Sequence, residues 1–297
     1  MTDDSPLVSI IIPTYNNADV VCQAIDCSFQ QSYERKEIIV IDDGSTDDTR
    51  RLLADPYGDS IRYLRQENRG AGCARNTGLR NASGSYLQFL DADDLLDPDK
   101  IRMQIAALGK LEQMALSYCD YVKCDLEDPS VHFDGSYVSP KLQEENPLED
   151  LILRWETELS IPIHCFLFDA RLFKENGISF DESLPANEDW DCWMDLFALR
   201  PGIVYIDRVL AYYRMRRESR CSDRLKMRRS HLVAINNQLK KNKNKREIVS
   251  KLNARISKIR FHYRDVGLLM RVMDKCPPVF KKLYCEIMPW RIQRIFD

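Results

Sequence analysis

The sequence predicts an α/β fold in which a Rossmann-like, mostly parallel sheet is flanked by helices and followed by a C-terminal helical extension. Short β-branched segments alternate with amphipathic segments over the first hundred residues. Strand patterns stop after residue 222, and a polar, basic segment follows. Strands separated by helices form βαβ units, whose strands are parallel. We expect an α/β domain over 1–220 and a basic helical region over 221–297.

The predicted elements follow one another at short intervals. Val8–Ile12 is an apolar, β-branched run ended by Pro13, which is typical of a buried parallel strand. Further strands are expected at 37–41, 61–64, 86–90, 165–168, 203–206 and 210–213. Helices are expected at 18–31, 46–54, 170–176 and 188–199 and after Pro98, and a loop that enters a helix is expected over 70–81. A turn is expected within 236–245 of the basic region.

The composition excludes several classes of protein. Of the 297 residues, 44% are hydrophobic and 30% charged, which is typical of a globular protein. We expect no signal peptide, because the first six residues are acidic and polar, and no apolar run approaches the roughly 20 residues of a membrane span. The ten cysteines form no CxxC pair, so we expect reduced thiols and a cytoplasmic location rather than a zinc site.

The charge is distributed unevenly. Residues 224–297 carry 20 Lys and Arg against 5 Asp and Glu, whereas the preceding residues carry 23 against 41. Basic residues interleaved with apolar ones after residue 255 suit an amphipathic segment on the inner face of an anionic membrane. Helices that pack on the first domain or form a homodimer are the alternative. We expect no nucleic-acid partner, because no RNA- or DNA-binding module is present.

Acidic residues occur where strands end or helices begin. Asp42 and Asp43 follow the second predicted strand, Asp91 and Asp93 follow the fourth, and the Glu188-Asp189 pair opens a helix. In open α/β sheets, ligands bind at the carboxyl ends of strands. Two carboxylates separated by one residue suit Mg²⁺ or Mn²⁺ shared with substrate phosphates. A P-loop and a GxSxG motif are both absent from the sequence.

Five segments in order resemble inverting glycosyltransferases of family 2, whose nucleotide-sugar domain has the GT-A fold. They are VSIIIPTYNN at 8–17, EIIVIDDGSTDDT at 37–49, RQENRGAGCARNTGL at 65–79, YLQFLDADD at 86–94 and NEDWDCW at 187–193. The resemblance covers about residues 7–216. It implies transfer of a hexosyl group from a nucleotide donor, with a UDP-sugar favoured. The acceptor would be a glycan or lipid-linked hydroxyl in surface polysaccharide synthesis.

The resemblance also implies a role for individual residues of the donor site. Donor-nucleotide contacts would come from Pro13, Thr14, Tyr15, Asn16, Asp42, Asp43, Arg75, Asn76 and Asp91. Within this set Asp42 would accept a hydrogen bond from uracil N3–H, with Asp43 in support. Asp91 and Asp93 would form the DxD motif. Asp91 would lie near the ribose and sugar, and Asp93, with Asp91, would ligate the metal.

The same resemblance implies that Asp189 is the general base, which takes a proton from the acceptor hydroxyl as that oxygen attacks the anomeric carbon. Glu188 would orient Asp189 or contact the acceptor. Where the family often has YRxHxxS, this chain has Arg216 in place of the histidine. Arg216 would clamp a phosphate, and a flexible surface loop is the alternative. Trp190 is left open between an acceptor contact and the core, whereas Trp193 is assigned to the core.

Two functions from other classes remain as alternatives. A phosphatase of the haloacid-dehalogenase type also places DxD after a strand, but there the strand comes first in the chain. The fifth position of that motif is also usually Thr or Val, and here it is Leu95. A non-catalytic nucleotide-sugar-binding or scaffold protein would share the fold but would not need Asp189.

Overall fold

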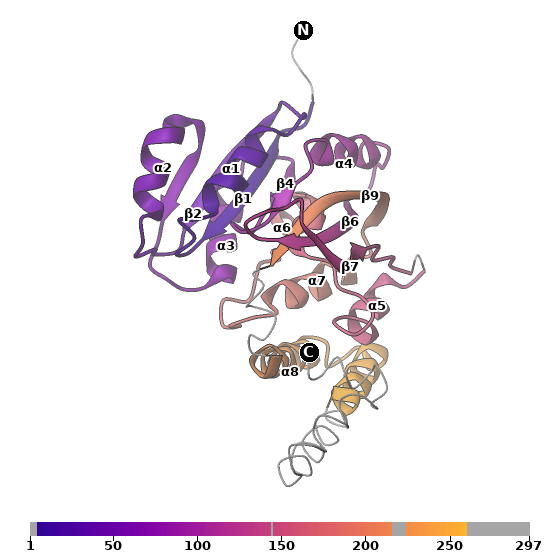
Figure 1. The fold of residues 1–297 in the computed structure, drawn as a ribbon. Helices are drawn as coiled ribbons and strands as arrows, with labels where there is room; N and C mark the ends of the chain where they lie inside the picture. Colours follow the sequence, from indigo (N-terminus) through magenta and orange to yellow (C-terminus); the bar gives the residue numbers. More distant parts are fainter. Residues whose placement is uncertain (1–4, 144, 216–223, 260–297) are drawn as a thin grey trace. The chain divides into compact units, whose positions relative to one another are not determined.

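The computed structural model describes residues 5–143, 145–215 and 224–259. The chain divides into two compact units, Met1–Arg217 and Glu218–Asp297. The first unit holds the sheet and the helices that flank it, and the described part of the second unit is helical (Figure 1). The predicted α/β fold is confirmed. A nucleotide-sugar-binding and catalytic role for the first unit stays a prediction at this point.

In the described part of the chain, the sheet has nine strands in the order β3-β2-β1-β4-β8-β6-β9-β5, with β7 paired to β6. The parallel half comprises β1 (Val8–Thr14), β2 (Lys36–Asp42), β3 (Arg62–Arg65) and β4 (Tyr86–Phe89). Thr14 is the partner of Asp42 in register, so β1 and β2 end at the same edge. This edge is where the acidic motifs were expected.

Helices cover both faces of the parallel half. They are α1 (Val21–Phe29), α2 (Thr49–Tyr57), α3 (Ala71–Asn81) and α4 (Lys100–Leu108), with a 3₁₀ turn η1 (Gly58–Ser60) after α2. Ile10 and Ile12 of β1 share one buried cluster with Ile25 of α1 and Ile101 of α4. On the other face, α3 packs so closely that a Cβ at Gly78 would overlap the side chain of Ile11. That contact holds α3 against β1.

The second half of the sheet is mixed. Its elements are β5 (Leu95–Leu96), β6 (Ala115–Asp125), β7 (His132–Val138), η2 (Ile163–Cys165), β8 (Leu167–Asp169) and β9 (Gly202–Met215). β6 pairs parallel to β9, whereas β4 with β8, β8 with β6, β6 with β7, and β5 with β9 are antiparallel. The two late strands predicted at 203–206 and 210–213 are one strand. Bulges in its pairing near Asp120 absorb the polar Asp207-Arg208 step that suggested a break.

The remaining helices of the first unit are α5 (Pro147–Leu153), α6 (Arg171–Lys174) and α7 (Glu188–Ala198). α7 is held by aromatic packing, because the ring of Trp193 stacks on Phe168 with centroids 4.9 Å apart. Near the start of α7, the indole N–H of Trp190 donates to the Leu151 carbonyl of α5 over 2.8 Å. Both tryptophans are fully buried. The start of α7, where the Glu-Asp motif lies, is thereby fixed.

In the second unit, the structure describes α8 (Arg224–Lys241) and a further helical stretch over 246–259. The turn predicted within 236–245 lies at 242–244, where the side-chain amide of Asn242 donates to the Gln238 carbonyl over 3.0 Å. In the described part of the chain, no helix has the length and apolar character needed to cross a membrane. The expected amphipathic segment after residue 259 lies outside the described residues.

Candidate active site

Arg75 of α3 joins two acidic segments that are far apart in the sequence. Its Nη1 donates to Oε1 of Glu188 over 2.5 Å, and its Nη2 donates to Oδ1 of Asp91 over 2.7 Å. Asp91 follows β4, and Glu188 begins α7. The structure thus brings the DxD segment and the Glu-Asp segment to the two sides of one guanidinium.

The Arg75 side chain is almost fully buried, and its guanidinium carbon lies 5.6 Å from the ring centroid of Phe180. Burial alone would lower the pKa of Arg75, but the charges of Asp91 and Glu188 outweigh it and raise the pKa. Arg75 therefore stays charged. A planar, two-armed cation suits this bridge, because each arm binds a different carboxylate.

Asp189 lies in the first turn of α7, directly after Glu188. The residue before them, Asn187, has a left-handed backbone (φ 61°), and its side-chain amide donates to Glu156 over 2.9 Å. Desolvation by the surrounding protein raises the pKa of Asp189 to about 7. The charge of Glu188 raises this pKa further, and the charge of Arg75 lowers it. A carboxyl that titrates near neutral pH is suited to proton transfer.

Arg214 of β9 binds the DxD loop, which comprises residues 91–94. The guanidinium Nε of Arg214 donates to the carbonyl of Asp93, and its main-chain N–H donates to Oδ1 of Asp94 over 2.9 Å. Oδ2 of the buried Asp94 lies 2.9 Å from Nδ1 of His164, a close charge contact without hydrogen-bond alignment. Burial alone would lower the pKa of His164, but the charge of Asp94 raises it. Asp94 is therefore a buried anchor of this loop.

Asp93 differs from Asp94, because solvent reaches its side chain and no ion pair holds it among the described residues. Desolvation by the surrounding protein raises the pKa of Asp93 to about 7, and the charges of Asp94 and Asp91 raise it further. An exposed carboxylate among acidic neighbours favours a cation.

Divalent cations that bind nucleotides commonly use one or two carboxylates plus phosphate oxygens. Asp91 and Asp93 fit that pattern. The described residues contain no group of three protein ligands, so substrate oxygens would have to complete the coordination.

Asp42 is fully buried at the end of β2, and both of its carboxylate oxygens are bound within the chain. Oδ1 accepts from the Ser45 N–H over 2.7 Å, and Oδ2 accepts from the Tyr63 hydroxyl over 2.5 Å. Nε of Arg65 lies 3.5 Å from the same Oδ2. These contacts fix the loop after β2. A hydrogen bond from uracil to Asp42 stays a prediction.

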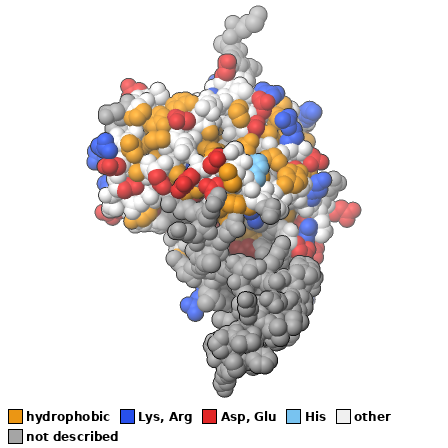
Figure 2. Space-filling view, viewed as in Figure 1, with side chains coloured by type: hydrophobic (Ala, Val, Ile, Leu, Met, Phe, Trp, Pro, Cys, Tyr) orange, Lys and Arg blue, Asp and Glu red, His pale blue; other side chains and the backbone are white. Residues whose placement is uncertain are grey.

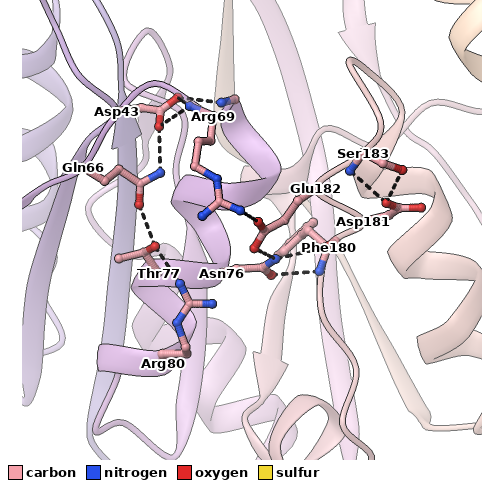
Figure 3. Close-up of polar contacts among 11 residues, drawn as sticks. Asp43, Gln66, Arg69, Asn76, Thr77, Arg80, Phe180, Asp181, Glu182 and Ser183 are labelled. Carbon is pink, nitrogen blue, oxygen red and sulfur yellow. Dashed lines mark hydrogen bonds and ion pairs between the residues drawn. The ribbon is translucent and has the colours of Figure 1, made fainter.

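Asp43 organises the segment that enters α3 (Figure 3). Its carboxylate accepts from the Gln66 side chain over 2.7 Å and from the main-chain N–H groups of Arg69 and Gly70, at 3.1 Å and 2.8 Å for the shortest contacts. Between Asp42–Asp43 and the rest of the loop, Gly44 has φ +81° and no room for a Cβ beside Asn68. The Asp-Asp-Gly segment is thus a tight structural corner.

A second set of contacts in Figure 3 ties α3 to the loop before α7. The Asn76 amide donates to the Phe180 carbonyl over 2.9 Å and accepts from the Phe180 N–H over 2.9 Å. Arg69 donates to Glu182 over 2.5 Å. Asn76 thus binds the main chain of the loop that leads to Asp189. The predicted nucleotide contact of Asn76 stays a prediction.

The loop after β1 is divided between buried and exposed residues. Pro13 and Thr14 are buried, whereas Tyr15 and Asn16 are exposed. Asn16 has a left-handed backbone (φ 51°), and its side-chain carbonyl accepts from the Thr46 N–H over 2.8 Å. The loops after β1 and β2 are therefore bound together, with the Tyr15 ring free of the core on one side.

The aromatic expectation needs one correction. Trp190 is fully buried and its N–H is bound, so it packs in the core and presents no face to an acceptor sugar, and Trp193 is buried as expected. Arg216 lies outside the described residues. Sequence reasoning gave no role to Arg214 and missed its contacts with the DxD segment and the contact of His164 with Asp94. Neither contact has a signal in the spacing of the residues.

The geometry now allows comparison with known proteins. The model of glycosyl transferase family 2 matches residues 9–175. The chain belongs to this family. An uncharacterized glycosyltransferase of Rickettsia typhi is 41% identical over 204 residues, which cover 68% of this chain and 62% of that protein. Chondroitin synthase of Escherichia coli is 30% identical over 198 residues, covering 66% of this chain and 27% of that protein.

Solved structures confirm the GT-A-type fold. The family 2 glycosyltransferase chain aligns with S. aureus TarS 1–349 in complex with UDP-GlcNAc at a TM-score of 0.62 and 20% identity, covering 84% of this chain and 72% of that one. A mannosyltransferase of Pyrobaculum calidifontis in complex with GDP-Man and Mn²⁺ aligns at a TM-score of 0.58 and 16% identity, covering 95% and 84%. The chain spans about three fifths of the Rickettsia typhi relative.

Proposed function

We propose that this family 2 glycosyltransferase is a metal-dependent, inverting hexosyltransferase, with a UDP-sugar as the favoured donor. The observation that carries the proposal is the Arg75 bridge between Asp91 and Glu188. It puts a pair of candidate metal ligands and a candidate base within reach of one substrate. The TarS complex with UDP-GlcNAc and the mannosyltransferase complex with GDP-Man and Mn²⁺ support a nucleotide-sugar donor and a divalent metal.

The donor nucleotide would lie along the edge formed by the loops after β1 and β2. The exposed Tyr15 ring is available to the base, and the TarS complex with UDP-GlcNAc supports the uracil preference. The diphosphate would lie toward the DxD loop. Mg²⁺ or Mn²⁺ bound by Asp93 and Asp91 would neutralise negative charge on the leaving diphosphate.

In the proposed reaction, Asp189 takes the proton of the acceptor hydroxyl as the acceptor oxygen forms a bond to the anomeric carbon. The bond from that carbon to the diphosphate oxygen breaks, and its electron pair leaves with the nucleoside diphosphate. A single displacement from the opposite face inverts the anomeric centre. The pKa of Asp189, raised to about 7, supports this role because a base works best when its pKa lies near the working pH.

The acceptor belongs to the proposal as well. A relative named chondroitin synthase supports a glycan acceptor and a role in polysaccharide synthesis. The excess of Lys and Arg after residue 224 supports a peripheral association with the inner face of the cell membrane, beside a lipid-linked acceptor. A homodimer built through the same helices is the alternative use of this segment.

A binding experiment tests the donor and the metal together. The melting temperature of the protein is measured with UDP, GDP and their sugar conjugates, each with Mn²⁺ and with chelator. A ligand that binds the native state raises this temperature, and we expect a metal-dependent rise with UDP and a larger one with one UDP-sugar. Asp93→Ala should abolish the metal dependence. No shift with any nucleotide would contradict the donor proposal and favour a scaffold role.

A further inference from the structure

An exposed aromatic side chain lies beside the acidic motifs. Tyr213 of β9 is 36% exposed, whereas its neighbours in sequence, Tyr212 and Arg214, are half-buried and buried. Successive side chains of a strand point to opposite faces. Arg214 is buried and reaches the carbonyl of Asp93, so Tyr213 projects to the other face of β9.

The Tyr213 ring is held rigidly on one side. It stacks on the ring of His164 with centroids 6.2 Å apart and an interplanar angle of 10°, and its edge meets Tyr121 at 6.5 Å and 83°. His164 is fully buried and contacts Asp94, the anchor of the DxD loop. Because His164 is fully buried, the exposed part of Tyr213 lies away from the His164 ring.

The side chain of Tyr213 lies beside the DxD segment, because His164, whose ring it contacts, lies 2.9 Å from Asp94. Burial raises the pKa of Tyr213, and the charges of Asp94, Asp93, Asp91 and Asp189 raise it further. The phenol is therefore protonated at neutral pH. Apart from strand pairing, the hydrogen bond that Tyr213 forms among the described residues is at its main-chain carbonyl, which accepts from the Cys124 thiol. Its hydroxyl has a proton to donate.

The other aromatic candidates lack these properties. Trp155, Trp190 and Trp193 are buried. Tyr137 is 55% exposed, but its hydroxyl donates to Asp120. Tyr15 is exposed on the loop after β1, at the nucleotide edge. Tyr213 alone among these six combines an exposed ring with a position beside His164 and Arg214, the two side chains that contact Asp94 and the Asp93 carbonyl.

We propose that Tyr213 is a sugar-binding residue at the point of transfer, whose exposed ring packs on the C–H face of a pyranose while its hydroxyl donates to a sugar hydroxyl. The electron-rich face of an aromatic ring attracts slightly positive C–H groups. His164 fixes the ring so that little conformational freedom is lost on binding. This inference rests on the proposed function, because it assumes that a sugar lies between the DxD segment and Asp189.

Isothermal titration separates the sugar from the nucleotide. Wild type, Tyr213→Ala and Tyr213→Phe are titrated in Mn²⁺ with UDP and with the UDP-sugar that stabilises wild type most. If Tyr213 stacks on the donor sugar, Tyr213→Ala weakens UDP-sugar binding by about tenfold while UDP binding is unchanged. Tyr213→Phe, which keeps the ring, restores most of the affinity. Tyr137→Ala, another exposed tyrosine of the sheet, should bind both ligands like wild type.

Transfer to a panel of p-nitrophenyl glycosides separates the two sources of the sugar ring. If Tyr213 stacks on the acceptor, Tyr213→Ala raises the acceptor KM about tenfold at unchanged donor affinity. The inference is overturned if Tyr213→Ala matches wild type in both assays, or if it weakens UDP and the UDP-sugar equally. Failure of wild type itself to bind any nucleotide sugar would instead contradict the proposed function.

Discussion

Asp42 and Asp43, at the end of β2, differ from Asp93 and Asp189, in the two other acidic motifs, in what they bind. Every carboxylate oxygen of Asp42 and Asp43 accepts at least one hydrogen bond from the chain. Among the described residues, Asp93 forms no ion pair and Asp189 accepts only from the main-chain N–H that follows it. The first pair builds the corner of the site, and the second pair is available to ligands.

The difference teaches how to rank acidic residues at the edge of a sheet. A carboxylate that is fully hydrogen-bonded is stabilised as an anion by its own fold, and removing it leaves buried N–H groups without partners. A carboxyl group whose pKa is raised destabilises the folded protein when it is ionised. Binding of a proton or a cation to the carboxylate relieves that destabilisation. Such costs are typical of functional sites.

The largest effect is expected from Asp189→Asn, which removes the proposed base at constant size. Turnover should fall by roughly 10²–10⁴-fold, the usual contribution of a general base, while donor affinity stays the same. Single-turnover kinetics with the donor found by the stability panel measures both. Asp195→Asn, farther along α7, is the matched control and should keep its activity. Wild-type turnover in Asp189→Asn would remove Asp189 from the mechanism.

The same base predicts a pH profile. The pKa of Asp189 is raised to about 7, so the carboxylate form that can accept a proton predominates only above that pH. We expect kcat/KM to rise through about pH 7 and this limb to be missing in Asp189→Asn. A profile that is flat from pH 5 to 8 would contradict the assignment.

The next effect in size is expected from Arg75→Met, which leaves Asp91 and Glu188 without their shared cation. Breaking a buried ion pair from one side typically costs about 3–5 kcal/mol, and the partial exposure of Asp91 argues for about 3 kcal/mol here. Urea unfolding measures it. Arg51→Met, whose partner Asp48 is on the surface, should unfold like wild type. Equal stability of both variants would show that Arg75 does not organise the site.

A direct test of the comparison sets Asp43→Asn against Asp93→Asn. Asp43→Asn should lose about 1–3 kcal/mol of folding free energy, because an amide N–H₂ would face the N–H groups of Arg69 and Gly70. The pKa of Asp93 is raised, so its ionised form opposes folding above pH 7. Asp93→Asn without metal should therefore be at least as stable as wild type at pH 8, yet lose metal-dependent donor binding. The reverse pattern would contradict the division of roles.

Much of this architecture could be predicted, because it depends on local patterns. The strands predicted at Val8–Ile12 and 37–41 have β-branched runs and lie within β1 and β2, although β1 continues through Pro13 to Thr14. The helix predicted at 188–199 has an apolar stripe and lies at α7. The contacts of Arg75 could not be predicted, because Glu188 is 113 residues away along the chain. The spacing of residues within one helix or strand does not indicate a contact between residues that lie so far apart in the chain.

The two tryptophans of α7 show the same limit. Trp190 and Trp193 are three residues apart, so their side chains leave α7 in similar but not identical directions. The sequence therefore allowed one of them to face solvent. Both are buried because α7 is covered on two sides, by α5 at Leu151 and by the rings around Phe168. A second covering element is a property of the tertiary fold, and for the same reason Tyr213, on a strand predicted in two pieces, carried no signal of its exposure.

The smallest effect is expected where α3 meets the loop before α7, at the ion pair of Arg69 and Glu182. The contact is short, but the Arg69 side chain is 61% exposed and Glu182 30%, so solvent and salt screen it. A double-mutant cycle with Arg69→Ala and Glu182→Ala should give a coupling energy below about 1 kcal/mol that shrinks in 1 M salt. Asn76→Ala should cost more, because it frees the buried N–H and carbonyl of Phe180. A coupling energy that exceeds the cost of Asn76→Ala and resists salt would mean that the ion pair, rather than Asn76, holds this loop beside Asp189.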